Sequence, residues 1–441
     1  MDQAATADLT PSAGVVARPG RTLALLVLMV VGTVNFVDRQ ILSVLIEPIR
    51  AELHFSDTQL GLLTGLAFGL FYAAMGIPAA MLADRTHRVR LVAAACLVYS
   101  FFTGACGFAT TFWQLAIARF GVGVGEGGGT APSLSVLADY YPPEKRPAVI
   151  GLFTVNGPIG VFVGASLGGW AAGQFGWRGA FVAVGLLGAV AAAILAAVVR
   201  EPVRGGLDPA PTRAAAADDA GGLAATVGLF LSRPTLRLLL LASGLSAFVS
   251  YGMLNWIPAY LMRVQHMPLA EVARWFGPAA GICMGVGIWG GGALVNWAGR
   301  RSLKAYAYVP GVAVLITGPT LALAVMASSW QASLALMLVP MITCTMFTAP
   351  VLALVQNLSP VASRATATAL VLLAFNIVGL GGGPLAIGIL SDALGKADVV
   401  DPLRVALIWV APVAVLSALA YLAVSRVVIR DAANVLKDAA A

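Results

Sequence analysis

The sequence predicts an all-α membrane protein whose twelve transmembrane helices form two pseudo-symmetric six-helix bundles, and two observations support this. The 441 residues are 59% hydrophobic and only 11% charged, whereas about 25% of the residues of a soluble domain are charged. The long apolar runs occur as six, a polar gap, and six more. Because one span needs roughly 20 apolar residues, the chain has room for about a dozen.

The first six runs lie between short polar breaks and give the expected helices 22–47, 58–83, 90–110, 112–138, 147–173 and 178–199. The last six give 235–262, 272–297, 303–327, 331–357, 363–391 and 403–428. The basic segment after the second helix has a counterpart after the eighth, which suggests two related halves. Related halves are common in secondary transporters, whose substrate site lies near mid-membrane between them.

These runs divide the chain into domains. We expect a first bundle at 22–199, a second at 235–428, a disordered N-terminal tail at 1–21 and a C-terminal tail at 429–441. The segment 200–234 holds several prolines and glycines, an alanine run and two adjacent aspartates. Since this composition cannot bury a core, it predicts a flexible cytoplasmic linker.

The distribution of Lys and Arg predicts the orientation. With a cytoplasmic N-terminus, 19 of the 27 basic residues fall in inside segments and six in outside connections, and the remaining two, Arg39 and Arg119, fall within helices. Cytoplasmic segments of membrane proteins are enriched in Lys and Arg. Both termini are therefore expected to be cytoplasmic. We separately expect the protein to lie in a bacterial-type inner membrane. The net charge of +7 has this explanation, and we expect no nucleic-acid partner.

Cysteine and histidine usage argues against an enzyme. The four cysteines lie in apolar runs without a paired spacing, and the three histidines lie in expected loops. This pattern predicts neither a disulfide framework nor a zinc site. We found no nucleophile–base or metal constellation, so we expect no cofactor, no metal and no enzymatic activity.

Four charged residues lie deep within two expected helices: Asp38 and Arg39 in the first, Arg119 and Glu126 in the fourth. A charge at the bilayer centre costs at least about 2.5–3.5 kcal/mol, so such residues face the protein interior or a wet cavity and are functional candidates. Arg119 and Glu126 are two turns apart and share one helix face, about 10 Å apart along the axis. Adjacent residues do not face each other, so we expect Asp38 and Arg39 to have different partners on the fourth helix.

We hypothesise that Asp38 and Glu126 change protonation during transport. Protonation of either acid would release an arginine to hold an anionic group, and deprotonation would reclaim that arginine. The alternative is that the four charges form buried pairs that only fix helix packing, although such pairs are often no more stabilising than apolar replacements.

The loop after the second helix, with its stretch Asp84-Arg85-Thr-His-Arg88-Val-Arg90, resembles the corresponding loop of the major facilitator superfamily. The resemblance extends over the chain through Gly292-Ala-Leu-Val-Asn296-Trp-Ala-Gly299-Arg300-Arg301, Arg119-Phe-Gly-Val-Gly123-Val-Gly125-Glu126 and Asn156-Gly157-Pro158-Ile-Gly160-Val-Phe-Val-Gly164. It implies the major facilitator fold and alternating access. It also implies a latch of Asp84 and Arg85, supported by Arg88, that meets the cytoplasmic end of the eleventh helix.

Two further features concern gating. Gly157 and Pro158 are expected to act in conformational change, and glycines four apart at 160, 164 and 168 fit close helix packing. The sequence departs from the family pattern at Ala80, where a glycine is usual, and at Asn296, where an acid is frequent. The second-half latch is therefore expected to be weak or absent.

Within that superfamily the chain resembles the spinster branch, through Asn35-Phe-Val-Asp38-Arg39-Gln-Ile-Leu, Phe55-Ser-Asp57-Thr-Gln-Leu-Gly61 and Glu126. This resemblance implies a proton-coupled carrier, expected to be a monomer, for amphipathic lipids such as lysophospholipids or sphingosine-1-phosphate. Arg39 and Arg119 would then hold the head group. Aromatic residues would line the acyl chain, and the candidates are Phe36, Phe71, Tyr72, Tyr251, Trp256 and Phe375. The alternatives are a proton-coupled carrier of small organic anions such as sugar acids, and multidrug efflux.

Overall fold

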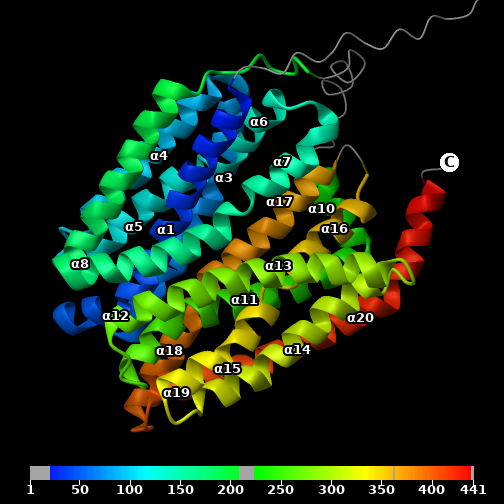
Figure 1. Ribbon diagram of the computed structural model, residues 1–441. Helices are drawn as coiled ribbons and strands as arrows, with labels where there is room; N and C mark the ends of the chain where they lie inside the picture. The colour runs from blue at the N-terminus through cyan, green and yellow to red at the C-terminus, as the bar shows by residue number, and fades with distance from the viewer. Residues whose placement is uncertain (1–19, 208–222, 361–362, 439–441) are drawn as a thin grey trace, which may run out of the picture.

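The computed structural model describes residues 20–207, 223–360 and 363–438, and every regular element among them is helical. The first half contains α1 Arg21–Leu53, α2 Asp57–Thr64, α3 Leu66–Arg85, α4 Arg88–Cys106, α5 Phe112–Gly127, α6 Thr130–Tyr140, the 3₁₀ turn η1 Pro143–Lys145, α7 Arg146–Phe153 and α8 Asn156–Val198. Figure 1 shows this half, from blue to green, packed beside the second half.

The second half contains α10 Leu223–Ser232, α11 Pro234–Arg263, α12 Leu269–Glu271, the π-helix η2 Val272–Phe276, α13 Gly277–Gly299, α14 Ala305–Val325, α15 Trp330–Thr343, α16 Thr348–Leu358, α17 Arg364–Ala374, the π-helix η4 Phe375–Gly382, α18 Gly383–Lys396, α19 Pro402–Ile408 and α20 Val410–Asp438. The prediction of an all-helical membrane protein is confirmed.

Ten helices in the described part of the chain are long and apolar enough to cross a membrane. The difference from the expected twelve arises in two places. The expected helix 112–138 is divided into α5 and α6, and the single stretch Pro143–Val198 contains two expected spans. Gly176, with φ 71° and ψ 168°, interrupts α8. A continuous helix of 43 residues would be about 65 Å long, roughly twice the hydrocarbon thickness, so this interruption fits two spans.

Small residues bring α1 and α8 together within the first half. A Cβ atom built on Gly160 would lie 2.2 Å from the Cβ of Phe36, and one built on Gly164 would lie 2.8 Å from the Cα of Val37. The glycine spacing noted in the sequence therefore marks a close helix contact, as expected for small residues four apart. This contact fixes the position of the α1 segment that carries Asp38 and Arg39.

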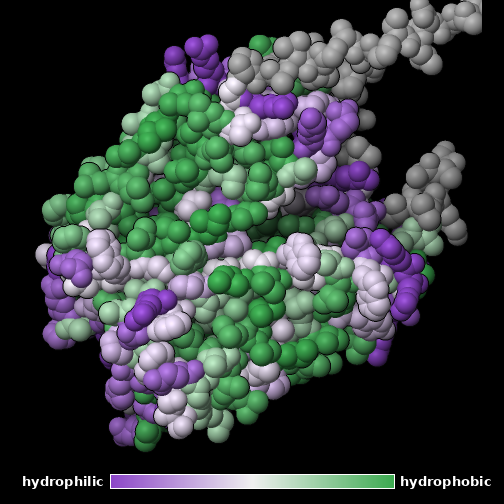
Figure 2. Space-filling model, viewed as in Figure 1, coloured by the Kyte–Doolittle hydropathy of each residue, from purple (hydrophilic) through white to green (hydrophobic). Residues whose placement is uncertain are grey.

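The two halves touch along α8 with α13 and along α2 and α3 with η4 and α18. A Cβ on Gly281 would lie 2.7 Å from the carbonyl oxygen of Pro158, and one on Gly61 would lie 2.6 Å from that of Pro384. Figure 1 shows α8 and α13 side by side. Figure 2 shows a recess between the halves, toward the side where both ends of the described chain lie.

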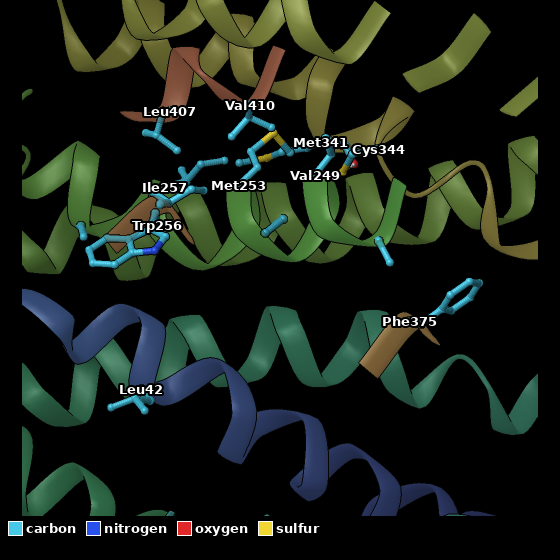
Figure 3. Packing of buried hydrophobic residues seen from close by; sticks show 14 of the residues in the cluster. Leu42, Val249, Met253, Trp256, Ile257, Met341, Cys344, Phe375, Leu407 and Val410 are labelled. Atoms are coloured by element: carbon cyan, nitrogen blue, oxygen red, sulfur yellow. Dashed lines mark hydrogen bonds between the residues drawn. The ribbon is translucent and has the colours of Figure 1, made fainter. Parts of the chain in front are cut away.

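Apolar side chains of the second half gather on one side of α11. Figure 3 shows Met253 and Ile257 on that side, with Met341 and Val410 packed against them, while Trp256 projects from the opposite side. All four of the packed residues are nearly fully buried. These contacts pack α11 against α15 and α20, and they belong to an apolar cluster that also includes Val37 and Ile41 of the first half.

The described ends of the expected linker 200–234 make defined contacts with the first and second halves. Glu201 accepts hydrogen bonds from Arg88 Nε and the Val89 amide, and the Gly205 amide donates to Asp139. Residues 223–232 form α10, whose apolar sequence packs beside α11 and α17. Residues 208–222 and most of the expected N-terminal tail lie outside the described chain, and the expected C-terminal tail continues α20 as far as Asp438.

Candidate functional site

The four charged residues singled out in the sequence form two ion pairs between α1 and α5. The Nε of Arg39 donates to Oε2 of Glu126 at 2.7 Å, and Nη1 of Arg119 donates to Oδ2 of Asp38 at 3.2 Å. Because Asp38 and Arg39 point in different directions on α1, each reaches a different turn of α5. The expectation of separate partners on that helix is confirmed.

Two neutral residues complete the cluster. The Thr103 hydroxyl on α4 donates to Oδ1 of Asp38, so each oxygen of this carboxylate has a partner. The ring of Phe68 on α3 lies between the two arginines, with its centroid 5.0 Å from the Cζ of Arg39 and 5.1 Å from that of Arg119. Such cation–π contacts stabilise a desolvated guanidinium. We call these four charged residues with Thr103 and Phe68 the charge cluster.

Glycines on α5 allow the helices around the charge cluster to approach closely. A Cβ on Gly123 would lie 2.7 Å from the Phe68 carbonyl oxygen, and one on Gly125 would lie 2.6 Å from the Tyr99 amide nitrogen. The glycine-rich stretch of α5 thus lets α3 and α4 pack directly on the helix that carries Arg119 and Glu126. This close packing explains how the four charged side chains are enclosed although few other polar side chains lie near them.

Only Arg39 in the charge cluster keeps appreciable exposure, with 14% of its side chain accessible. Asp38, Arg119 and Glu126 are between 0% and 1% exposed. All four were expected to line a wet cavity or the interior, and the structure places three of them in the interior. Glu126 Oε1 and Arg119 Nε are buried without a hydrogen-bond partner among the described residues. An unpaired buried polar atom is costly; here, in the described part of the chain, Glu126 Oε1 lacks a donor and the Arg119 Nε–H lacks an acceptor.

Aromatic residues lie close to the guanidinium of Arg39. Its Cζ lies 5.2 Å from the Phe36 ring centroid and 4.4 Å from that of Tyr72. Tyr251, on α11 of the second half, is close enough to interact electrostatically with Arg39. The structure therefore brings Phe36, Tyr72 and Tyr251 to the charge cluster from three helices and from both bundles.

The other three aromatic candidates lie elsewhere. Phe71 packs on Phe120 with ring centroids 4.7 Å apart. Phe375 is 6% exposed and packs edge-on against Phe347. Trp256 is fully buried and its indole N–H donates to the Pro384 carbonyl. Trp256 thus joins α11 to α18 in this conformation, and its place in a substrate cavity stays a prediction.

Of the expected latch residues, the structure describes the side chains of Arg85 and Arg88. Arg88 is 3% exposed, and its guanidinium pairs with Asp139 and Glu201 of the first half. Arg85 is exposed, and the side chain of Asp84 lies outside the described residues. In this conformation Arg88 ties α4 to α6 and to the segment after α8, and its part in the latch stays a prediction.

Gly157 and Pro158 lie where the halves meet. A Cβ on Gly157 would lie 3.4 Å from the Phe36 ring and 3.5 Å from the Met284 side chain of α13. The Pro158 carbonyl faces Gly281, as described above. This pair is thus placed between Phe36, which contacts Arg39, and the second bundle. The position suits an element that transmits motion, which remains a proposal.

One cluster that sequence reasoning missed closes the end of the molecule farthest from the described termini. Arg263 at the end of α11 donates to both oxygens of Asp57, at 2.7 and 2.8 Å, and to Glu47 at 2.6 Å. The carboxylate of Asp392 accepts from the Asp57 and Thr58 amides at 3.0 and 2.8 Å, capping the positive N-terminus of α2. We call Glu47, Asp57, Arg263 and Asp392 the closing cluster.

No metal site accompanies these clusters. Within the described chain, no three His, Cys, Asp or Glu side chains gather as metal ligands would. The four cysteines are buried and unpaired by disulfides.

Comparison with known proteins identifies the family. The model of the Major Facilitator Superfamily matches residues 28–319, about two thirds of the chain. This chain belongs to the major facilitator superfamily. It is accordingly an integral membrane protein of a transporter family and not an enzyme.

Solved structures agree with the predicted branch. A bacterial homologue of the human lysosomal transporter Spinster matches this major facilitator protein with a TM-score of 0.85 in its inward-facing, unoccupied conformation and 0.81 in its inward-facing, occupied one. The sequences are 30% and 29% identical, and each match covers 94% of this chain and 98% of that chain. The resemblance to spinster-like transporters is confirmed.

Sequence relatives point to several substrates. An MFS-type efflux pump of Mycolicibacterium smegmatis is 32% identical over 83% of this chain and 84% of its own length. A hexuronate transporter of Bacillus subtilis is 27% identical over 59% of this chain and 62% of its own length. The relatives agree on the family but differ in what they transport, so the substrate is inferred from the residues of the charge cluster.

Proposed function

We propose that this protein is a proton-coupled secondary transporter of an amphipathic anionic or zwitterionic lipid, of the lysophospholipid or sphingosine-phosphate class, that works by alternating access. One observation carries the proposal. Arg39 is the single member of a buried, charge-balanced cluster that reaches an accessible surface, and aromatic rings from both bundles surround it.

The charge balance of the cluster would couple proton binding to substrate binding. Two carboxylates and two guanidinium groups cancel in a region where an unpaired charge is costly. Protonation of Glu126, whose Oε1 has no partner among the described residues, would leave Arg39 without its counter-ion. An anionic head group bound to Arg39 would restore neutrality. Release of the proton would return Arg39 to Glu126 and expel the head group.

The pair of Asp38 with Arg119 is assigned a supporting role in this cycle. Both residues are buried, and Phe68 joins Arg119 to Arg39 through its ring. A change in the protonation of Asp38 would therefore alter the charge felt by the other pair. We propose that the two acids carry protons together, with Glu126 as the acid that contacts the substrate-binding arginine.

The amphipathic substrate follows from what surrounds Arg39. A guanidinium group binds phosphate through several parallel hydrogen bonds. Phe36, Tyr72 and Tyr251 offer flat apolar surfaces beside it, suited to the start of an acyl chain. A small sugar acid would use the arginine but gain little from the three rings.

The conformation fits alternating access. With the orientation predicted by the basic residues, the closing cluster is extracellular and the recess in Figure 2 opens to the cytoplasm. We propose that the opposite conformation breaks the closing cluster and forms the latch of Asp84 and Arg85. Gly157 and Pro158 would move with the contact between α8 and α13.

Two alternatives are favoured by particular relatives. The similarity to a hexuronate transporter favours a sugar-acid carrier, in which Arg39 would bind a carboxylate. The similarity to an efflux pump favours a multidrug exporter, whose substrates would use the aromatic rings more than the arginine.

A competition experiment separates the three functions. Purified protein in liposomes would be tested for flux of a labelled lysophospholipid, with unlabelled lysophospholipid, glucuronate or ethidium as competitors. We expect only the lysophospholipid to compete. The Arg39→Gln variant should lose roughly tenfold or more of the flux, since a hydrogen bond to a charged group contributes about 1.5–3 kcal/mol.

Arg21→Gln is the matched control, because Arg21 lies at the far end of the same helix and its guanidinium stacks on Tyr141. Its flux should equal that of the wild type. Competition by glucuronate or ethidium, with no effect of lysophospholipid, would contradict the lipid proposal and support the corresponding alternative.

A further inference from the structure

A groove on the outer face of the second bundle lies apart from the transport site. It runs between α14 and α20 and encloses about 200 Å³. Its walls are aliphatic apart from two tyrosines. The side chains at its outer rim are Tyr308, Val312, Leu315, Val415, Leu419 and Leu422. Each of these six is between 40% and 55% exposed, so the groove faces outward, where a bilayer would surround it.

The two helices that form the groove are antiparallel and in close contact. A Cβ on Gly311 would lie 3.0 Å from the Cβ of Tyr421, and one on Gly318 would lie 3.1 Å from the Cα of Ala411. In these two contacts the residue number increases along α14 while it decreases along α20. The start of α14 and the last turns of α20 therefore lie at the same end of the groove.

Basic residues continue both walls at that end. Lys304 is four residues before Tyr308, and Arg426 is four residues after Leu422. Residues four apart share a helix face, so each cation lies about 6 Å along the axis from the last apolar residue of its wall. Arg430 is one further turn along α20, and Arg301 precedes α14.

These cations are available for a ligand. Arg301, Arg426 and Arg430 are exposed and Lys304 is half-buried. Within the part of the chain that the structure describes, only Arg430 has an acidic neighbour, Asp431 at 3.8 Å, and that acid is buried and accepts from the Thr235 amide. Figure 2 shows hydrophilic residues over the region where α20 is drawn beside the end of α13 in the view of Figure 1.

We propose that this surface is a binding site for an anionic phospholipid of the surrounding bilayer. One acyl chain lies in the groove between α14 and α20, and the phosphate group lies between Lys304 and Arg426, with Arg301 and Arg430 beside it. The site is distinct from the charge cluster, and its existence does not depend on which substrate the protein carries.

The combination of an apolar groove and a cationic end favours an anionic phospholipid. Clusters of Lys and Arg at the membrane boundary attract anionic lipid head groups, and with the predicted orientation these four lie in the cytoplasmic leaflet. A second copy of this chain would bring the same cations together and place like charges opposite each other. An uncharged lipid would leave the cations without a partner.

The test uses the full-length protein in phosphatidylcholine liposomes that contain phosphatidylglycerol with a photoactivatable acyl chain. Labelled peptides are mapped by mass spectrometry after illumination. We expect the label to concentrate on the α14 and α20 residues of the groove. Unlabelled phosphatidylglycerol should displace it, and additional phosphatidylcholine should not.

Charge variants test the head-group contact. The double variant Lys304→Gln with Arg426→Gln should reduce labelling of the groove at least roughly tenfold. The matched control is Arg90→Gln with Lys145→Gln, which removes two exposed basic residues from cytoplasmic connections of the first bundle. Its labelling should equal that of the wild type.

A groove-filling variant tests the acyl-chain contact without a change of charge. Ala418→Phe places a ring in the groove, whereas Leu416→Phe, on the same helix but outside the groove, is its control. Only Ala418→Phe should abolish the labelling.

The proposal would be overturned if the label spread over all outward-facing helices or if phosphatidylcholine displaced it equally well. Either result would show that only bulk lipid surrounds these helices. Concentrated labelling that survives removal of both cations would overturn the head-group assignment. Cross-links between two copies of the chain at the groove would identify a dimer contact in place of a lipid.

Discussion

Replacing Arg263 with glutamine is expected to shift this transporter toward the conformation that is open at the closing cluster. Arg263 makes hydrogen bonds to Asp57 at 2.7 and 2.8 Å and to Glu47 at 2.6 Å. The arginine side chain is 20% exposed, and those of Glu47 and Asp57 are 17% and 5% exposed. Without it, Glu47 loses its cation and Asp57 keeps, among the described residues, only Arg50, an exposed residue whose Nε lies 3.5 Å from Oδ1 of Asp57.

The size of the effect follows from this burial. Breaking a fully buried pair by removing one partner costs about 3–5 kcal/mol, and exposed pairs contribute below about 1 kcal/mol. For this partly buried triad we expect about 2 kcal/mol against the closed end. Since 1.4 kcal/mol corresponds to a factor of ten, the population ratio should shift roughly 30-fold toward the open form.

Spin labels across the closing cluster measure that shift. Ala51→Cys at the end of α1 and Ala397→Cys after α18 introduce labels at exposed positions in the two bundles, and the four native cysteines are buried. We expect one short distance in the otherwise unaltered labelled protein and a major additional long distance in the Arg263→Gln variant. Double electron–electron resonance in liposomes reports both populations.

Arg404→Gln is the control, because Arg404 pairs with Asp401 within one connection of the second bundle. Its distance distribution should match that of the unaltered protein. An unchanged distribution in Arg263→Gln would refute the reasoning, since it would show that the charged contacts do not hold the two bundles together at this end.

Three further substitutions test the packing that positions the charge cluster. Phe68→Leu removes two cation–π contacts, each of about 0.5–2 kcal/mol, and should lower flux roughly tenfold in liposomes while the protein remains folded; unchanged flux would contradict a role for the ring. Gly160→Ala should destabilise the protein by about 1–3 kcal/mol through overpacking and lower its unfolding temperature, whereas Gly173→Ala, with nothing within 4 Å, should not. Arg88→Ala strands two acids and should cost about 3–5 kcal/mol; a melting temperature no lower than that of the exposed-site variant Arg90→Ala would show that this pairing is unimportant.

The charge cluster could be predicted largely from the sequence because its members conflict with their surroundings. Asp38, Arg39, Arg119 and Glu126 stand out in apolar helices, where charges are costly. Helix geometry then indicates that adjacent residues on α1 need separate partners on α5. This inference requires only local periodicity, and the structure confirms it.

The neutral members could not be predicted in the same way. Thr103 and Phe68 are ordinary residues for a membrane helix, and their roles arise from contact with charges on other helices. The sequence likewise indicates that these charges do not face lipid, but it does not tell whether water or other side chains surround them. In the structure, Asp38, Arg119 and Glu126 are surrounded by protein.

The closing cluster was missed for the opposite reason. Glu47, Asp57 and Arg263 lie near helix ends, where charged residues are expected to meet water and therefore attract no attention. The packing of Trp256 could not be predicted, because an aromatic residue in an apolar helix gives no sign of which side of the helix it occupies. Its contact with Pro384 depends on how the two helices pack.

The central claim is that protonation of a buried carboxylate controls the availability of Arg39, and gradient-driven flux tests it most directly. Liposomes containing wild-type protein or the Glu126→Gln or Asp38→Asn variant would be loaded with labelled lysophospholipid, with and without an imposed pH gradient. The account predicts that the gradient accelerates wild-type flux severalfold and that Glu126→Gln responds little, although it still exchanges substrate. Variants that respond to the gradient as strongly as the wild type would contradict it.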